Sequence, residues 1–352
     1  MSVAINGTDG ITFNDGSLQP SAIGKNLIIN GNMQIAQRGT SSTGVTSGGY
    51  YTVDRWRHQL SGGGTYTDAQ TALTSSDAPF VDGFSQSVKY DCTTAYTSAN
   101  SFNVHRQIIE GQNLQQLAYG TSSAKSLTLS FWVKSNVTGT AVATLYLEDS
   151  GKQIGQTYTI DATNTWEYKT VTFVGDTAST FDNDNNASLY VNLMMATGTD
   201  YTSGTLPSTW TTYSNADFAA GQTIDISAST SNEISFTGVQ LEANTTATPF
   251  EHLQYGQQLA LCQRYYEYGT RNFYGSTDSS ANIVTEETYK VVKRATPTMV
   301  YGTWTWYRSG GTGTGSPSNY QTNVNKWSCY IGTGLGDSAA RSGGAWTASS
   351  EL

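Results

Sequence analysis

The stretch KSLTLSFWVKSNVTGTAVATLYLED, residues 125–149, decides the fold class of this chain. It contains two runs rich in aliphatic and aromatic side chains, 125–135 and 140–149, with a short polar segment between them. Short runs of this kind, bounded by Ser, Thr, Asn and Gly, are typical of β-strands. The stretch therefore predicts two consecutive strands.

Comparable runs recur along the chain and predict further strands at residues 84–92, 155–162, 166–175, 187–196, 221–228 and 233–242. Residues 27–29 and 50–60 are earlier strand candidates, with a tight turn expected at Asn30-Gly31. The segment 103–118 fits either a short helix or a strand. Several short strands at this spacing predict an all-β sandwich.

The composition agrees with a β-rich globular protein. Charged residues make up only 13% of the chain, which holds 36 glycines and 22 tyrosines. Thr, Ser, Asn and Tyr favour strands and turns, and abundant aromatic residues argue against disorder. A length of 352 residues fits two or three domains with a substantial core.

Charge and motif spacing argue against several function classes. A net charge of −9 without a cluster of Lys and Arg argues against nucleic acid as a partner. No apolar run reaches the roughly 18 residues needed to span a bilayer, and the first residues do not resemble a signal peptide. The scattered histidines and cysteines match no metal-binding spacing, and we expect isolated thiols made in a reducing compartment: Cys92, Cys262 and Cys329.

The segment ATPFEHLQYGQQLALCQRYYE, residues 247–267, is the one that clearly predicts a helix. Pro249 favours an extended entry, because the residue before a proline avoids the helical region. After it, four residues recur with helical spacing and form one stripe: Tyr255, Leu259, Cys262 and Tyr266. We therefore expect a connecting helix at residues 256–267.

This helix separates the expected domains. Residues 26–255 are predicted to form the sandwich, and residues 268–352 a second β-rich domain. Within the second domain, the glycine-rich segment 310–320 is expected to form a surface loop. Residues 1–25 are too short for a core of their own, so they form either a flexible tail or a segment that becomes ordered against another molecule.

Four segments, taken in order, resemble a widespread family of bacteriophage tail and fibre proteins: NLIINGNMQIAQRGT (26–40), YTVDRWR (51–57), LSFWVKSNVTGT (129–140) and ISFTGVQLEANTTATPFEHLQYGQQLALCQRYYE (234–267). The C-terminal GGAWTASSEL is also similar to the ends of such proteins. The resemblance implies a virion protein, made in the host cytoplasm, with a jelly-roll domain similar to carbohydrate-binding modules. It further implies a homotrimer that binds a bacterial surface glycan.

The N-terminal segment resembles short segments of phage fibre proteins. The resemblance implies that residues 1–25 attach the chain to a phage tail or capsid protein. Ile11 and Phe13, which lie on one face of a short predicted strand, are the candidate attachment residues. The family has no uniform catalytic motif, so the resemblance transfers no catalytic residues.

Glycan binding needs exposed aromatic rings, together with short polar side chains for the sugar hydroxyls. The long loop at residues 197–218 offers Tyr201, Trp210 and Tyr213 in such surroundings. The alternative is a loop that is held in place by its own aromatic side chains. A second candidate pair is Trp304 and Trp306, whose alternative role is packing in the core or in a trimer interface.

A metal site and a catalytic site are also considered. Asp176, Asp182 and Asp184 lie close together among asparagines, which suits a structural calcium ion, and the alternative is a polar hairpin loop. The resembled jelly rolls often hold such a calcium. A glycosidase would need two suitably spaced carboxylates, and the candidates are Asp54, Glu110, Glu148, Glu167, Glu242 and Glu251.

Nothing in the sequence fixes the geometry of a carboxylate pair, and strand-edge carboxylates are usually solvated. We therefore expect a non-enzymatic tail fibre that adsorbs to a host glycan. The alternatives are a head fibre or capsid decoration protein of the same modular type, a glycan depolymerase, and a purely structural tail component. Three further tryptophans lie within predicted strands and are expected in the core: Trp56, Trp132 and Trp166.

Overall fold

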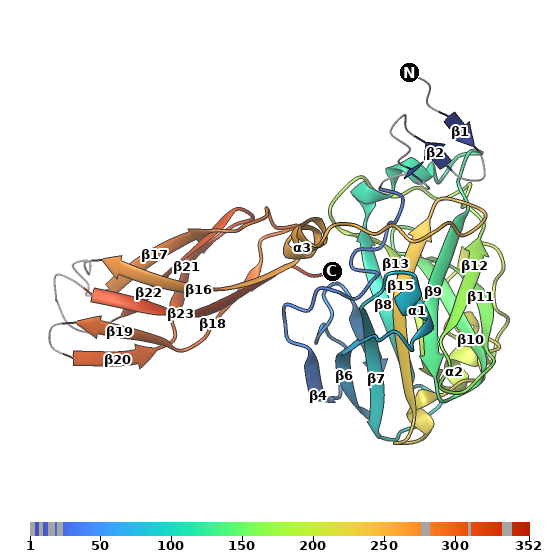
Figure 1. Ribbon diagram of the computed structural model, residues 1–352, viewed down its shortest axis with the longest axis horizontal. Coiled ribbons are helices and arrows are strands. Elements are labelled where there is room, and N and C mark those ends of the chain that lie inside the picture. Colours follow the sequence, from blue (N-terminus) through green and yellow to red (C-terminus); the bar gives the residue numbers. More distant parts are fainter. Residues whose placement is uncertain are drawn as a thin grey trace. The chain divides into compact units, whose positions relative to one another are not determined.

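A computed structural model of the chain describes residues 4–6, 10–12, 18–19, 24–275, 282–308, 311–332 and 340–352. The chain divides into two compact units, Met1–Gln254 and Tyr255–Leu352. Both units are built mainly from antiparallel β-sheets, as Figure 1 shows. The all-β class predicted from the sequence is confirmed.

The first unit is a sandwich of two six-stranded sheets. One sheet, called the β10 sheet, has the order β14 (Thr211–Thr212), β11 (Lys152–Ile160), β10 (Gly139–Leu147), β13 (Ala187–Thr197), β8 (Phe102–Glu110) and β5 (Arg57–Ser61). The other, called the β9 sheet, has the order β12 (Glu167–Phe173), β9 (Leu127–Ser135), β15 (Glu233–Glu242), β7 (Gln86–Thr94), β6 (Thr65–Ala72) and β4 (Ser41–Val45).

Consecutive strands of the first unit repeatedly change sheet, which is the jelly-roll arrangement. Side chains of a strand alternate between its two faces, so each sheet presents one face to the core and one outwards. Phe131 of β9 and Leu145 of β10 are fully buried in the shared core. Their neighbours in sequence, Trp132 and Tyr146, therefore lie on the outer faces.

Most of the predicted strands are confirmed, including β9 and β10 in the stretch at residues 125–149. The undecided segment 103–118 holds strand β8, followed by the 3-10 helices η1 (Gly111–Asn113) and η2 (Gln115–Leu117). Two strand predictions are wrong, because residues 27–29 form no strand and residues 221–228 contain the 3-10 helix η4 (Ile226–Ala228). The predicted strand at 50–60 is wrong in part, because β5 begins only at Arg57. The other short helices of this unit are α1 (Ala78–Val81), α2 (Thr199–Thr202) and η3 (Asn215–Asp217).

Polar side chains tie the two sheets together inside the core. The imidazole of His58 on β5 lies 2.8 Å from the carboxylate of Asp68 on β6. His105 on β8 is stacked against Phe236 on β15, with ring centroids 5.0 Å apart, and its Nδ1 lies 2.6 Å from the hydroxyl of Tyr90 on β7. These contacts give partners to polar groups that would be costly to bury alone, although Nε2 of His105 has no hydrogen-bond partner among the described residues.

The N-terminal residues form a small three-stranded sheet of β1 (Ala4–Asn6), β2 (Gly10–Thr12) and β3 (Leu18–Gln19). Ile11 belongs to β2, as the predicted short strand requires, although its side chain is outside the described part of the structure. Phe13 lies outside the described residues. The attachment role of both residues therefore stays a prediction.

The second unit begins with helix α3 (Tyr255–Gln263). The predicted helix at 256–267 was too long, because Tyr266 already belongs to strand β16. Cys262 of the predicted stripe is buried, whereas Tyr255 is 60% exposed. The three cysteines are free thiols, and each is buried.

Two sheets make up the rest of the second unit. One combines β16 (Tyr266–Gly275), β23 (Ala340–Ser349), β18 (Thr298–Tyr301), β19 (Trp304–Arg308) and β20 (Gly311–Gly315), and the other combines β17 (Asn282–Thr288), β22 (Lys326–Gly332) and β21 (Ser318–Thr322). The predicted loop at 310–320 is wrong in part, because β20 and the start of β21 lie within it. Three tryptophans dominate the core of this unit: Trp304, Trp327 and Trp346.

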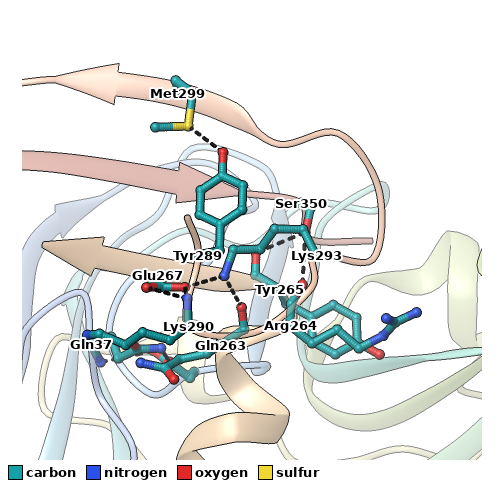
Figure 2. A network of polar contacts seen from close by, with 11 residues as sticks. Gln37, Gln263, Arg264, Tyr265, Glu267, Tyr289, Lys290, Lys293, Met299 and Ser350 are labelled. Atoms are coloured by element: carbon teal, nitrogen blue, oxygen red, sulfur yellow. Dashed lines mark hydrogen bonds and ion pairs between the residues drawn. The ribbon is translucent and has the colours of Figure 1, made fainter. Parts of the chain in front are cut away.

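A buried ion pair links helix α3 to the second unit's sheets, as Figure 2 shows. The ammonium group of Lys293 lies 2.6 Å from the carboxylate of Glu267, and both side chains are almost completely buried. Lys293 also donates a hydrogen bond to the carbonyl of Gln263, at the end of α3. Burial lowers the pKa of Lys293, while the charge of Glu267 raises it.

We expect the first unit to lose stability in mild acid because of His105. Burial, with a smaller contribution from His58, lowers the pKa of His105 well below its ordinary value of 6.5. The unfolded chain then takes up a proton near that pH that the folded chain does not, so this stabilisation is present above pH 6.5 and is lost as the pH falls. Thermal unfolding at pH values from about 7.5 to about 5.5 measures this effect.

The variant His105→Phe keeps the ring stack but has no titratable group, so its Tm should fall less steeply with acidification. Its Tm at neutral pH should be lower than that of the wild type, because the Tyr90 hydroxyl loses its partner. His252 is exposed, so His252→Gln is the control that should keep the wild-type slope. An unchanged slope in His105→Phe would contradict the assignment.

The ion pair in the second unit gives a second stability prediction. Lys293→Met leaves the Glu267 carboxylate buried without its counter-charge, which should lower the free energy of unfolding by about 3–5 kcal/mol. Adding Glu267→Gln removes that charge, and the double variant should recover most of the loss. Chemical denaturation followed by tryptophan fluorescence tests both, and a double variant that is no more stable than Lys293→Met would exclude the charge as the cause.

Candidate functional site

The outer face of the β10 sheet carries a pocket of about 310 Å³, which we call the tyrosine pocket. Strands β8, β10 and β13 provide its floor, and the segment from α2 to η3 provides its wall. Aromatic rings predominate among its lining residues, which also include one cation and one carboxylate: Phe102, Arg106, Tyr146, Glu148, Tyr190, Tyr201, Tyr213 and Phe218. Both features, concavity and a few polar groups among rings, are typical of ligand sites.

The floor follows from the alternation of the strands. Tyr146 of β10 and Tyr190 of β13 are direct cross-strand partners, with ring centroids 5.5 Å apart. The ring of Tyr213 lies 5.4 Å from that of Tyr146. In β10 and β13 the residues adjacent to Tyr146 and Tyr190 point into the core, so the outward position is the only one left for these two tyrosines. The three rings form a connected aromatic surface.

The wall is an ordered segment held by backbone hydrogen bonds. The amide of Ala219 donates to the carbonyl of Tyr201 over 2.8 Å, and the amide of Tyr213 donates to the carbonyl of Gly151 over 2.8 Å. Asp217 accepts a hydrogen bond of 2.7 Å from the amide of Thr205. The long loop predicted at residues 197–218 is therefore fixed in place before any ligand arrives.

Arg106 is the positively charged group of the pocket. Its Nε donates to the side-chain oxygen of Asn192 over 2.6 Å, and its guanidinium lies 5.2 Å from the centroid of the Tyr190 ring. Burial lowers the pKa of Arg106 to about 10, which leaves it charged at neutral pH. Because one nitrogen is held by Asn192, the guanidinium has a fixed orientation while other N–H groups remain for a ligand.

The tyrosine hydroxyls of the pocket stay protonated at neutral pH. Burial raises the pKa of Tyr146, Tyr190 and Tyr213 above the ordinary value, with smaller contributions from neighbouring charges. Glu148 is exposed at the pocket and adds a hydrogen-bond acceptor. The pocket therefore combines ring faces, neutral hydroxyls, one cation and one carboxylate.

Two of the three loop residues predicted as glycan ligands lie in this pocket, namely Tyr201 and Tyr213. Tyr213 is 36% exposed, whereas Tyr201 is partly covered by Phe102. Trp210 lies elsewhere: its ring packs against the sandwich core, and its Nε1 donates to the carbonyl of Val174 over 2.7 Å. This position matches the alternative considered for the loop, an aromatic side chain that holds it in place.

Trp304 and Trp306, the predicted pair in the second unit, do not form a shared exposed surface. Trp304 is 1% exposed, and its indole nitrogen donates to the carbonyl of Ala345 over 3.0 Å. It offers no ring face to a ligand, because it is part of the unit's core. Trp306 is half-buried, and its ring covers Gly313 and Gly315 of the neighbouring strand.

The predicted calcium ligands are not brought together. Asp176 is buried and forms an ion pair of 2.9 Å with Lys152. Asp184 accepts a hydrogen bond of 2.9 Å from the amide of Asn186, and Asp182 is exposed. Among the residues that the structure describes, no group of three or more His, Cys, Asp or Glu side chains could hold a metal ion. The arrangement matches the alternative of a polar loop, in which these carboxylates organise the chain.

Sequence reasoning missed most of the strand residues of the pocket. Tyr146, Tyr190 and Arg106 sit between core positions of their strands, so the signal was an aromatic or charged residue at an outward position of three different strands. That signal becomes specific only when the strand order is known, because β10, β13 and β8 are neighbours in the sheet but not in the sequence.

Most carboxylates considered as catalytic candidates have structural partners. Asp54 accepts a hydrogen bond from the amide of Gln37 over 3.0 Å, and Glu110 accepts one from the Gln112 side chain over 2.5 Å. Glu167 forms an ion pair of 2.6 Å with Lys169. Glu242 accepts a hydrogen bond from the segment that follows β15, and Glu251, within that segment, accepts one from the amide of Asn26. Of the six candidates, only Glu148 lines the tyrosine pocket.

Comparisons with known proteins give a fold likeness at low similarity. No protein-family model matches the chain, and no curated protein matches it. Similar solved structures include the enzymatically active domain of tailspike protein 4 of bacteriophage CBA120, with 14% identity and a TM-score of 0.32 over 62% of this chain and 21% of that chain. The match thus spans about a fifth of the tailspike domain's length.

Carbohydrate-binding modules are also among the similar structures. The family 11 module of the Clostridium thermocellum cellulase Lic26A-Cel5E has 11% identity and a TM-score of 0.31, over 64% of this chain and 99% of that chain. The CBM22-2 xylan-binding domain of Paenibacillus barcinonensis Xyn10C has 12% identity and a TM-score of 0.27, over 54% and 92%. Likenesses this distant do not decide the function of this chain.

None of the helices in the described residues has the length and hydropathy of a membrane-spanning segment.

The position of Trp210 predicts a structural role. Trp210→Ala removes core packing and the hydrogen bond to Val174, so the free energy of unfolding should fall by roughly 2–3 kcal/mol. Trp210→Phe keeps much of the ring and should lose about 1 kcal/mol. Chemical denaturation measures both. An alanine variant with unchanged stability but reduced glycan binding would place this ring in the ligand site instead.

Proposed function

We propose that this chain is a non-enzymatic glycan-binding protein of a bacteriophage virion and that the tyrosine pocket holds part of a bacterial surface glycan. The observation that carries the proposal is the pocket itself: three tyrosine rings, Arg106 and Glu148 meet on one outer sheet face. Aromatic faces pack against the apolar faces of sugar rings, and the hydroxyl, guanidinium and carboxylate groups serve the sugar hydroxyls.

The rigidity of the pocket supports binding. Its floor is a central part of a six-stranded sheet, and its wall is held by backbone hydrogen bonds. A preformed site avoids the entropy cost of ordering loops on binding. Arg106 adds a fixed positive charge, which suits a glycan that carries carboxylates or phosphates as well as a neutral one.

The absence of a carboxylate pair at the pocket supports binding without hydrolysis. Glycoside hydrolysis by the common mechanism uses two carboxyl groups that flank the scissile bond. The described lining of the tyrosine pocket includes Glu148 as its single carboxylate. A depolymerase is the alternative from a different class, and it predicts that the purified chain releases reducing ends from host capsule or lipopolysaccharide.

The virion role rests on the resemblance of residues 26–267 to phage tail and fibre proteins. In such an assembly the small N-terminal sheet attaches to a tail or capsid protein, and several copies present their pockets together. A homotrimer would convert weak individual contacts into useful avidity. A head fibre uses the same modules, and locating the protein on virions by labelled antibodies distinguishes the two positions.

Tyr213→Ala tests the pocket at its exposed rim. The variant should lower the affinity for host cells or extracted surface glycan by about tenfold, equivalent to about 1.4 kcal/mol, while Tm changes little. Tyr146→Ala in the floor should lower the affinity at least as much. The matched control is Tyr96→Ala, because Tyr96 is 37% exposed and does not line the pocket.

Binding is measured by titration of fluorescently labelled protein with whole cells, and folding by thermal unfolding of each variant. Wild-type affinity in both pocket variants would exclude the tyrosine pocket as the glycan site. Release of reducing ends by the wild type, abolished by Glu148→Gln, would replace the binding proposal with the depolymerase.

A further inference from the structure

The outer face of the β9 sheet carries a second and larger pocket, of about 850 Å³, which we call the tryptophan pocket. It lies on the opposite sheet of the sandwich from the tyrosine pocket. Strands β9, β12 and β15 supply its floor, and the segment after β15 supplies one wall. Its lining includes Asp82, Phe84, Trp132, Tyr168, Thr170 and His252.

The floor places an aromatic pair beside a hydroxyl pair. Trp132 of β9 faces Tyr168 of β12 as a cross-strand partner, and Ser130 faces Thr170 in the same register. The two rings have centroids 5.4 Å apart and an angle of 55° between their planes. Tyr168 is 46% exposed, and Trp132 is half-buried rather than in the core as the sequence predicted.

Of the two hydroxyl residues beside these rings, Thr170 is exposed, whereas Ser130 is 2% exposed. In the described part of the chain, neither the Ser130 nor the Thr170 hydroxyl has a hydrogen-bond partner within the protein. The carboxylate of Asp82 adds an acceptor at the edge of the pocket. The floor thus pairs ring faces with the exposed hydroxyl of Thr170, two residues from Tyr168 on the same strand.

The wall that follows β15 is held by buried polar side chains. Glu242, which is 3% exposed, accepts a hydrogen bond of 2.8 Å from the amide of Thr248. Gln240, which is fully buried, accepts one of 2.9 Å from the amide of Glu251, whose carboxylate in turn accepts one of 2.9 Å from the amide of Asn26. This irregular segment therefore has a fixed shape without belonging to a strand.

Three further rings line the pocket besides Trp132 and Tyr168, namely Phe84, Phe250 and His252. Phe84 contacts both Phe250 and His252, with centroid distances of 4.9 Å and 5.2 Å. Gly238 has a φ of +62°, and a Cβ at this position would lie 2.7 Å from the Phe84 ring. The pairing of β15 with β9 is irregular between Thr237 and Gln240. Glycine at position 238 therefore lets the Phe84 ring pack against this part of β15, which fixes the shape of the pocket there.

We propose that the tryptophan pocket is a second carbohydrate site, which binds a neutral oligosaccharide of two or more sugar units. The proposal rests on the proposed glycan-binding function and extends it to a face that the tyrosine pocket does not use. Its volume falls within the range of about 300–1,000 Å³ for ligand pockets. Mutually inclined rings fit successive sugar faces, the Thr170 hydroxyl can donate to or accept from a sugar hydroxyl, and the Asp82 carboxylate can accept from one.

The charge of the lining selects the ligand class. Lys and Arg do not occur among the lining residues that the structure describes, and Asp82 carries a negative charge. Lys25 lies behind the wall, where its ammonium group donates to the Thr248 hydroxyl and the Pro249 carbonyl. An acidic sugar would meet the Asp82 carboxylate, whereas hydroxyl groups of a neutral sugar can donate to it. The tyrosine pocket, which holds Arg106 beside Glu148, also suits a sugar that carries an acidic group. The two sheet faces would thus read chemically different parts of a surface glycan.

The test uses four neutral trisaccharides as probes: maltotriose, cellotriose, β-1,4-galactotriose and triacetylchitotriose. Isothermal titration and saturation-transfer NMR are run on the full chain. We expect at least one probe to bind the wild type, Tyr168→Ala to weaken it about tenfold, and Thr170→Val to weaken it severalfold by removing one hydroxyl. Tyr96→Ala is the control outside both pockets, and thermal unfolding checks that every variant folds.

Three results would overturn this inference: no probe binds the wild type, both floor variants bind like the wild type, or binding is lost in Tyr213→Ala but kept in Tyr168→Ala. A Tyr168-dependent self-association seen by light scattering would also overturn it, since the face would then be an interface between copies. Loss of host-cell binding in Tyr213→Ala together with any of these results leaves the proposed function intact. If the probes bind in a Tyr168-dependent manner while cells are not bound through the tyrosine pocket, only the first site fails.

Discussion

The structure depends on one constraint: two six-stranded sheets must bury their inner faces against each other. In β10, Leu145 and Leu147 meet that requirement, and the residue between them, Tyr146, has no choice but the outer face. The same alternation in β9 buries Phe131 and Val133 and turns Trp132 outwards. Core residues and pocket residues thus occupy alternate positions of the same strands. A one-residue slip of either strand would exchange the two sets.

The all-β class and most strands could be predicted because this alternation is a local property of the sequence. The failures occur where side chains take over backbone hydrogen bonds. The apolar run at 27–29 forms no strand because the amide of Ile28 donates to the side chain of Asn26, and that of Ile29 donates to the side chain of Gln107. Asp225 likewise accepts from the amide of Ser227 and turns the predicted strand at 221–228 into a short helix. Composition alone does not show whether a backbone amide bonds to a nearby side chain or to a neighbouring strand.

The candidate site was predictable only in the part that lies in one loop. Tyr201 and Tyr213 attracted attention because a long loop rich in rings and hydroxyls is visible in the sequence. Tyr146, Tyr190 and Arg106 come from strands whose adjacency depends on the jelly-roll order. Trp210, in the same loop, instead holds the loop in place, because its indole N–H donates to the Val174 carbonyl and its ring packs against the core. A high number of aromatic residues therefore indicates a candidate region of the sequence. Only the contacts of each side chain show whether it holds the loop in place or lines the pocket.

Charged side chains and aromatic rings have different structural roles in the first unit. Carboxylates such as Asp54, Glu242 and Glu251 bind backbone amides and hold irregular segments, which leaves few charges on the pocket floors. The floors are therefore made of rings and hydroxyls on strands, with Arg106 as the fixed exception. Contacts of that kind depend on shape and desolvation more than on long-range charge, so they are weakly screened by salt. The net charge of −9 is thus set largely by side chains outside the two pocket floors.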